Sequence, residues 1–125
     1  MKCAIDANEG LGVIEISVTG PFSLQEVGES LQEMWARRLQ TGIHNVLWDL
    51  TGADLSEVSS SELRAVASHQ LLDRPELPKG KAALVVSQDY EFGMARAMAS
   101  FMELSPVEIQ IFRGRDVALK WLLEG

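Results

Sequence analysis

Hydroxyl and carboxyl side chains gather in one short stretch of the chain. Three consecutive serines, Ser59, Ser60 and Ser61, follow Asp54 and Glu57. A phosphate on a serine at a helix start meets exposed backbone amides and the positive end of the helix dipole, which is favourable. Carboxylates beside it suit a basic protein surface. The residue types therefore mark this stretch as a candidate phosphorylation or partner-binding site.

The same residues also have a purely structural interpretation. Ser59 and Glu62 have the spacing of a capping box, in which the hydroxyl accepts an amide hydrogen bond and the carboxylate reaches back. Glu57 and Glu62 would repel a phosphate on Ser59. Both interpretations stay open, and Ser60 and Ser61 accept a phosphate by the same argument. A solvated loop is the alternative to a docking site.

A second group of residues suits an apolar ligand. Methionine is flexible, so three methionines repeating every four residues on one helix face can line a pocket for an acyl chain or fill an ordinary core. Tyr90 and Arg96 offer polar contacts at the mouth of such a pocket, and Trp121 offers a wall. The ligand-pocket candidates are Tyr90, Met94, Arg96, Met98, Phe101, Met102 and Trp121.

The other reactive side chains predict no chemistry. His44 and His69 lack cysteine or carboxylate neighbours at metal-ligand spacing, and Cys3 lacks a CxxC partner, which favours a small buried side chain. Asp49 is predicted to be a turn or capping acid. The sequence holds no glycine-rich phosphate loop, nucleophile elbow or HExxH motif. We therefore expect no metal, no cofactor and no enzymatic activity.

The elements that position these residues begin with a hairpin and a helix. Residues 3–7 predict a short strand, and apolar residues alternating with polar ones at 14–19 predict its partner, which Gly20-Pro21 ends. Ser23 then opens a helix by the same capping-box spacing, and Gly42 ends it. Its predicted inward stripe consists of Leu24, Val27, Leu31, Met34, Trp35 and Leu39.

Arg37 and Arg38 follow Trp35 near the end of this helix. Basic residues at a helix C-terminus complement the dipole, which is the favoured interpretation. The alternative is an interfacial anchor formed with the indole ring.

Three strand and helix pairs are predicted next. Residues 45–50 and 81–87 are apolar runs typical of strands covered on both faces, and residues 107–111 alternate as a last strand. Helices are predicted from Ser59 to the residue before Pro75, from Asp89 to about residue 105, and at the end of the chain. The closing helix has a predicted inner side of Val117, Ala118, Trp121 and Leu122.

This order predicts one α/β domain over residues 1–125. Strands alternating with helices form right-handed crossovers, so the predicted order ββαβαβαβα makes an open, mostly parallel sheet with an N-terminal antiparallel β-hairpin.

Two segments add a family resemblance to this order. They are Phe-Gly-Met-Ala-Arg-Ala-Met at 92–98 and Ile-Gln-Ile-Phe-Arg at 109–113, which leads to Ala-Leu-Lys-Trp-Leu at 118–122. With them the chain resembles the SpoIIAA-like family, related to the STAS domains of anti-sigma factor antagonists and anion transporters. The resemblance implies a STAS-like fold and a regulatory or protein-interaction role.

In anti-sigma factor antagonists, a partner kinase phosphorylates a serine within a motif like Asp-Ser-Ser-Gly. Here Glu57 matches the motif's Asp, but Val58 then stands at the serine, and only a shift by one residue brings Ser59 there. The glycine is missing. The resemblance therefore implies an interaction domain without the intact phosphoserine motif. Some SpoIIAA-like proteins are similar to the CRAL-TRIO fold, which implies an alternative: a binder of a lipid or other apolar small molecule, with peripheral membrane contact.

The net charge of the chain limits the classes of partner that we expect. The chain has 125 residues and a formal net charge of -7, and no uncharged apolar run approaches the roughly 18 residues of a membrane span. Residues 1–62 hold ten acids and three bases, whereas residues 63–125 hold eight of each. We therefore expect a cytoplasmic protein that binds a basic protein partner and no nucleic acid. The edges of an open sheet also permit a homodimer.

Overall fold

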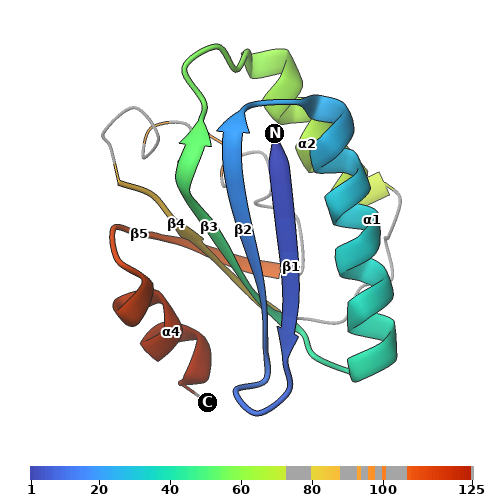
Figure 1. The fold of residues 1–125 in the computed structure, drawn as a ribbon, viewed down its shortest axis with the longest axis vertical. Helices are drawn as coiled ribbons and strands as arrows, with labels where there is room; N and C mark the ends of the chain where they lie inside the picture. Colours follow the sequence, from blue (N-terminus) through green and yellow to red (C-terminus); the bar gives the residue numbers. More distant parts are fainter. Residues whose placement is uncertain (73–79, 88–92, 94–95, 98–99, 101–106, 125) are drawn as a thin grey trace.

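Five strands form one mixed sheet in the computed structural model, which describes residues 1–72, 80–87, 93, 96–97, 100 and 107–124 (Figure 1). The strands lie side by side in chain order; β1 and β2 are antiparallel, and every later pair is parallel. The elements are β1 (Lys2–Asn8), β2 (Val13–Pro21), α1 (Leu24–Thr41), β3 (Asn45–Asp54), α2 (Ser60–Leu72), β4 (Gly80–Val85), β5 (Val107–Phe112) and α4 (Arg115–Leu123).

This architecture confirms the predicted fold class and order. The predicted helix from Asp89 lies mostly outside the described residues, although Gly93, Arg96, Ala97 and Ser100 are helical. The second strand continues through Pro21, past its predicted end, because Gly20 and Pro21 pair with Ala53 and Asp54 of β3. Gly20 has a positive φ of 84°, which glycine tolerates.

The two faces of the sheet have separate cores. On β2, Ile14 and Ile16 point to the face that α1 and α2 cover, whereas Val13 points to the face that α4 covers. We call these the α1 face and the α4 face. The α1-face core is the larger and consists of Ile14, Ile16, Val18, Val27, Leu31, Met34, Trp35, Ile43, Val46, Trp48, Ala53, Leu55, Val66, Leu84 and Val86. The α4-face core consists of Val13, Leu47, Ala83, Val85, Ala118 and Leu122.

The ends of α1 form as predicted. The Oγ of Ser23 accepts a hydrogen bond from the amide of Glu26 at 3.4 Å, and the Glu26 carboxylate pairs with the Met1 ammonium group at 2.9 Å. At the other end, Gly42 has a φ of 72° and its amide donates to the carbonyl of Arg38 at 2.8 Å. The positive φ is why glycine ends this helix.

The predicted inward stripe of α1 is wrong at its last position. Leu39 is 83% exposed, and Arg38 is the buried neighbour at 5%. The Arg38 guanidinium lies 4.6 Å from the Trp35 ring centroid, and its Nη2 donates to the His44 carbonyl at 2.9 Å. Burial lowers the pKa of Arg38. The interfacial anchor is wrong, because Trp35 and Arg38 are both buried. Arg38 does lie in the last turn of α1, where its charge complements the dipole, and it also packs between α1 and the sheet.

Helix α4 is held to the sheet by apolar contacts and by hydrogen bonds at its carboxyl end. Ala118 and Leu122 are buried as predicted, but Val117 is 55% exposed and does not belong to the inner side. The Asn45 Nδ2 donates to the Leu122 carbonyl at 3.1 Å, and the Lys81 Nζ donates to the Trp121 carbonyl at 3.0 Å. These donors bind carbonyls of the last turn, and the Trp121 carbonyl also accepts from the Glu124 amide at 3.3 Å.

Candidate functional site

The strand before the candidate loop contains a β-bulge. β3 was predicted to end at Leu50 but continues to Asp54. Ser17 pairs with Asp49, whereas Thr19 pairs with Gly52, so two residues of β3 face one residue of β2. Bulges are rare between parallel strands, and they re-aim side chains next to functional sites. This bulge therefore decides how the following loop is presented.

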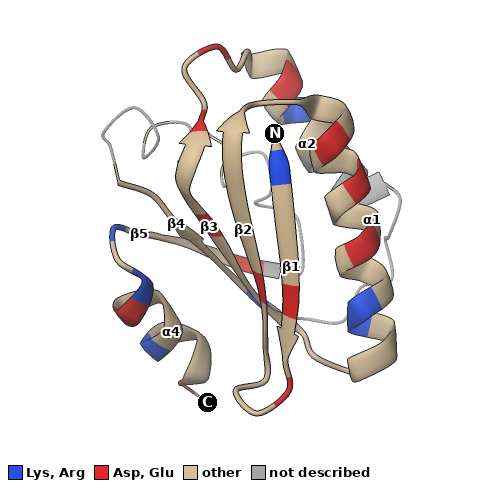
Figure 2. Cartoon of the chain, in the orientation of Figure 1, with Lys and Arg blue, Asp and Glu red and all other residues tan. Residues whose placement is uncertain are grey.

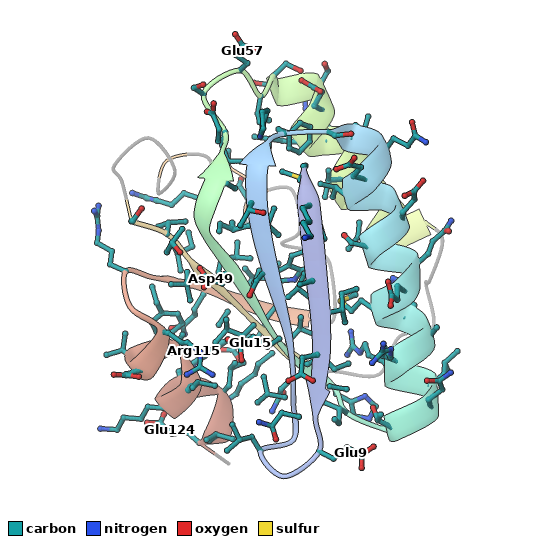
Figure 3. All side chains as sticks on the ribbon, in the orientation of Figure 1. Glu9, Glu15, Asp49, Glu57, Arg115 and Glu124 are labelled. Carbon is teal, nitrogen blue, oxygen red and sulfur yellow. The ribbon has the colours of Figure 1, made fainter. Side chains whose placement is uncertain are left out.

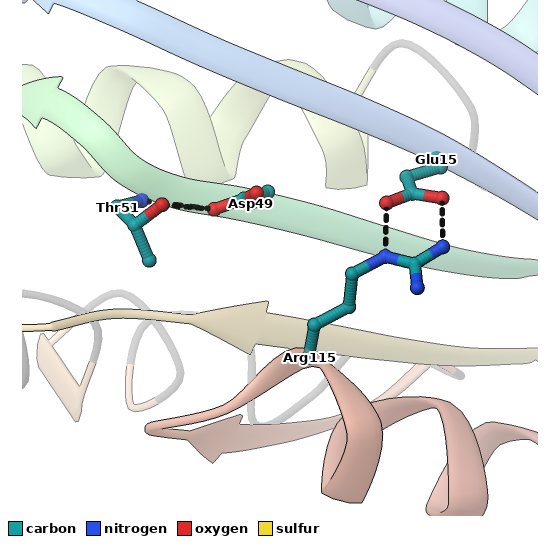
Figure 4. Close-up of polar contacts among 4 residues, drawn as sticks. All are labelled: Glu15, Asp49, Thr51 and Arg115. Carbon is teal, nitrogen blue, oxygen red and sulfur yellow. Dashed lines mark hydrogen bonds and ion pairs between the residues drawn. The ribbon is translucent and has the colours of Figure 1, made fainter.

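Asp49 binds the amide and the hydroxyl of Thr51, which lies in the bulge. Its Oδ1 accepts hydrogen bonds from the Thr51 amide at 3.0 Å and from the Thr51 Oγ1 at 2.6 Å (Figure 4). Gly52 allows the close approach of the strands, because a Cβ there would lie 2.9 Å from the Thr19 Cγ2. Asp49 thus makes the short-range hydrogen bonds typical of a turn acid, but it makes them within β3 and not at the end of the strand.

The bulge reverses which residues of β3 face the α1 core. Before it, Val46 and Trp48 point to this core; after it, Ala53 does, as does Leu55 just past the end of β3. The inward positions thus change from even to odd. Without the extra residue the pleat would turn Asp54 toward the core, but with it Asp54 is exposed.

Asp54 holds the beginning of the loop in one conformation. Its Oδ1 accepts hydrogen bonds from the Ser56 amide at 3.0 Å and the Ser56 Oγ at 2.6 Å. The hydrogen bond from the Ser56 hydroxyl, followed by that from its amide, lowers the pKa of Asp54. The Asp54 carbonyl also accepts from the Phe22 amide at 3.1 Å, which ties the loop to the start of α1.

Ser59 caps α2 in the predicted manner. Its Oγ accepts from the Glu62 amide at 3.2 Å, and the Glu62 Oε1 accepts from the Ser59 amide at 3.1 Å. The same Oγ lies 3.1 Å from the Ser61 Oγ. The capping role of Ser59 is confirmed, while Ser60 and Ser61 are exposed in the first turn. Phosphorylation of any of the three serines stays a prediction.

Glu57 lies at the tip of the loop, on the outside of the molecule (Figure 3). Acidic residues also occur along α1 and on β1, β2 and β3 (Figure 2). The structure therefore brings Asp54, Glu57 and the first turn of α2 together in one exposed loop at the carboxyl end of β3. Such a loop can present carboxylates and hydroxyls to a basic surface.

The ligand-pocket candidates are only partly covered by the described residues. Tyr90, Met94, Met98, Phe101 and Met102 lie outside them, and Arg96 is exposed. Trp121 is half-buried on α4.

The Trp121 ring already has partners within the protein. Its centroid lies 5.6 Å from that of Phe112 and 5.0 Å from the Lys81 Nζ. A pocket wall formed by Trp121 stays a prediction.

The sequence did not predict one polar contact, between Arg115 and Glu15. The Nε and Nη2 of Arg115, at the start of α4, donate to the two carboxylate oxygens of Glu15 on β2 at 2.7 and 2.9 Å (Figure 4). This fork, followed by the charges of Asp116 and Asp49, raises the pKa of Arg115. The partners are 100 positions apart, so no local spacing could reveal them.

Two features are absent from the described part of the chain: a cluster of metal ligands and a helix that could cross a membrane. No group of three or more histidine, cysteine or carboxylate side chains there is arranged to hold a metal ion. None of the helices described has the length and hydropathy to cross a bilayer.

The fold of this chain is similar to that of a protein of known structure. No family model matches the chain, and no curated protein does. Among solved structures, it is similar to an uncharacterized protein of the DUF3478 family from Shewanella loihica PV-4, which has a SpoIIAA-like fold. The TM-score is 0.61 at 16% identity, over 97% of this chain and 92% of that one. The fold of this chain is therefore SpoIIAA-like, as its sequence resemblance implied.

Proposed function

We propose that this protein is a non-enzymatic regulatory domain that binds a protein partner with a basic surface through residues 52–63. The observation that carries this proposal is the β3 bulge, which turns Asp54 outward at the start of an acidic loop. Hydrogen bonds within the loop hold the carboxylate of Asp54 before any partner arrives. A preorganised loop loses little conformational entropy on binding, which favours affinity.

The negative charge of the loop favours a partner with a basic surface. Asp54 and Glu57 are exposed, and the acidic excess of the chain lies within residues 1–62. Acidic side chains on a rim accelerate association with a basic surface and repel acidic ones. The cytoplasmic location, the homodimer and the apolar-ligand alternative all stay predictions.

Affinity capture from the source cells, followed by chemical cross-linking and mass spectrometry, tests the proposal. The double variant Asp54→Lys and Glu57→Lys should lose a partner that wild type retains. The matched control is Glu29→Lys with Glu33→Lys, which reverses two exposed charges on α1. If both double variants retain the same partners as wild type, residues 52–63 are not the contact surface.

A further inference from the structure

β1 is an edge strand whose outer side pairs with no other strand among the described residues. It pairs with β2 alone, over an unbroken register from Lys2 to Asn8. No other described element passes in front of β1 in Figure 1. Proline and bulges often blunt such an edge, but β1 contains neither. Its outer amide and carbonyl groups therefore form a template for a further strand.

The side chains of β1 alternate between an apolar and a charged side. Cys3 and Ile5 pack against the α1-face core. Lys2, Ala4 and Asp6 point to the opposite side and are exposed. The two charges have opposite signs and are placed symmetrically about Ala4. Because like charges directly opposite each other destabilise a sheet, an added strand must place an acid beside Lys2 and a base beside Asp6.

Neither charge is matched within the described part of the chain. Lys2 lies opposite Thr19, and Asp6 lies opposite Glu15 across the hairpin. Neither Lys2 nor Asp6 forms an ion pair or a side-chain hydrogen bond with a described residue. Arg115 offsets the charge of Glu15 but does not pair with Asp6. A base on the outer side of Asp6 would therefore stabilise the hairpin.

A second copy of β1 supplies both matching charges. Two antiparallel copies related by a two-fold axis at Ala4 place Lys2 of each copy opposite Asp6 of the other. The same register places Cys3 opposite Ile5, so apolar side chains also meet apolar ones on the α1 face. No other two-fold register of β1 brings Lys2 opposite Asp6. The sequence of β1 is thus complementary to itself in one register.

The edge strand at the other side of the sheet lacks this property. β5 has the sequence Val-Glu-Ile-Gln-Ile-Phe and contains no basic residue, so a second copy of β5 could not match Glu108. Self-complementary charge therefore distinguishes β1 from β5.

Pairing through β1 would also place the two copies of α1 on the same side of the joined sheet. Two acids of α1 already have positive partners: Glu26 pairs with the Met1 ammonium group at 2.9 Å, and Glu33 pairs with Arg37 at 3.5 Å. These partners and salt reduce the repulsion between the two helices.

We propose that β1 pairs antiparallel with β1 of a second copy of this chain, with the two-fold axis at Ala4. The two five-stranded sheets then form one continuous sheet, and Lys2 and Asp6 form two reciprocal ion pairs across the junction. This surface uses no residue of the loop at 52–63, so the inference goes beyond the proposed function and does not depend on it.

Sedimentation velocity over a range of protein concentrations tests this pairing. Lys2→Asp and Asp6→Lys each turn both ion pairs into like-charge contacts, so each should weaken the dimer roughly tenfold. A mixture of the two variants has opposite charges at both positions again and should form a heterodimer about as stable as the wild-type dimer. The control Glu108→Lys reverses an exposed charge on β5 and should leave the dimer unchanged. Circular dichroism shows that each variant folds.

A cysteine at the two-fold axis tests the register. Directly opposed Cα atoms of antiparallel strands lie about 4.5–5.5 Å apart, which a disulfide can span. In a Cys3→Ser background, Ala4→Cys should therefore oxidise to a covalent dimer. The control Thr19→Cys, at an exposed position of β2, should stay monomeric.

Four outcomes would overturn the pairing. They are a wild type that stays monomeric at every concentration, a dimer that neither charge variant weakens, a mixture that forms no heterodimer, and a disulfide that forms no faster at Ala4 than at Thr19. The variant Asp54→Lys with Glu57→Lys separates the two proposals, because it should dimerise like wild type even where it loses the partner of the loop.

Discussion

The α1 face and the α4 face of the sheet are stabilised in different ways. The α1 face has a continuous apolar core that includes residues from every strand from β2 to β4. The α4 face has a small core, and polar contacts fasten both ends of its one described helix: Arg115 to Glu15, and the last carbonyls to Asn45 and Lys81. Helix α4 thus combines a small apolar core with polar contacts at its two ends. Such an element should open at lower free energy than the main core.

Truncating one buried leucine on each face gives the largest contrast. Leu31 is 3% exposed on α1 and Leu122 is 1% exposed on α4. Leu31→Ala should lower the free energy of unfolding by about 2–5 kcal/mol, because it leaves a cavity in the main core. Leu122→Ala should mainly accelerate amide exchange in α4. Urea unfolding and hydrogen exchange by mass spectrometry measure both effects. Equal global losses without selective exchange in α4 would show that the faces unfold as one unit.

Gly80→Ala should destabilise the base of the α1 face. The new Cβ would clash with the His44 carbonyl oxygen and lie 3.0 Å from the Arg38 Nη2, and the backbone oxygen cannot move aside easily. We expect a loss of about 1–3 kcal/mol in thermal unfolding. Gly28→Ala is the control, because its Cβ would meet no atom within 4 Å and alanine favours the helix. A neutral Gly80→Ala would contradict this close packing.

Asn45→Ala should loosen the carboxyl end of α4. The Asn45 side chain donates to the Leu122 carbonyl and accepts from the Lys81 amide at 3.2 Å, so truncation leaves both without this partner. We expect a loss of about 1–2 kcal/mol in urea unfolding, together with faster exchange in α4. His44→Ala removes a neighbouring exposed side chain and should change neither. If Asn45→Ala leaves exchange in α4 unchanged, the apolar contacts alone hold the helix.

The Glu15 and Arg115 pair should contribute less. The side chains are 21% and 47% exposed, so water and salt screen their attraction. A double-mutant cycle with Glu15→Gln and Arg115→Gln should give a coupling of about 0.2–1 kcal/mol that shrinks in high salt. A coupling that salt does not change would mean that the pair is more deeply desolvated than its exposure indicates.

Acid should remove the smallest contribution, that of Asp54 to its loop. The pKa of Asp54 is lowered from 3.8, so its stabilising effect is complete above that value and is lost as the pH falls through the folded pKa. Ser56→Ala removes the hydroxyl that contributes most to the shift. The difference in urea midpoint between wild type and Ser56→Ala should therefore shrink between about pH 5 and pH 2. A difference that does not change with pH would argue against this hydrogen bond.

The sequence predicted features that depend on neighbouring residues. The caps at Ser23 and Ser59 were read from short spacings because a helix terminus is satisfied by side chains within one turn. The strands of the central sheet followed from apolar runs, and the mixed topology followed from their order. Family resemblance supported the same fold.

The sequence failed where one residue's surroundings come from distant segments. The helical period of apolar residues predicts that Leu39 faces inward, but the main core ends before Leu39. Arg38 is buried instead, between Trp35 and the His44 carbonyl. The bulge in β3 was not predicted, because it depends on the pairing of β3 with β2 and not on any turn residue. The end of β3 was therefore placed too early.

For the candidate site, the sequence by itself determined the residue types: acids and serines ahead of a capped helix, within a chain whose acidic excess lies in its first half. Only the tertiary structure decided which of them are presented. The pairing of β3 with β2 leaves one extra residue of β3 in a bulge. Because side chains alternate along a strand with a period of two, this extra residue turns Asp54 outward and Ala53 inward.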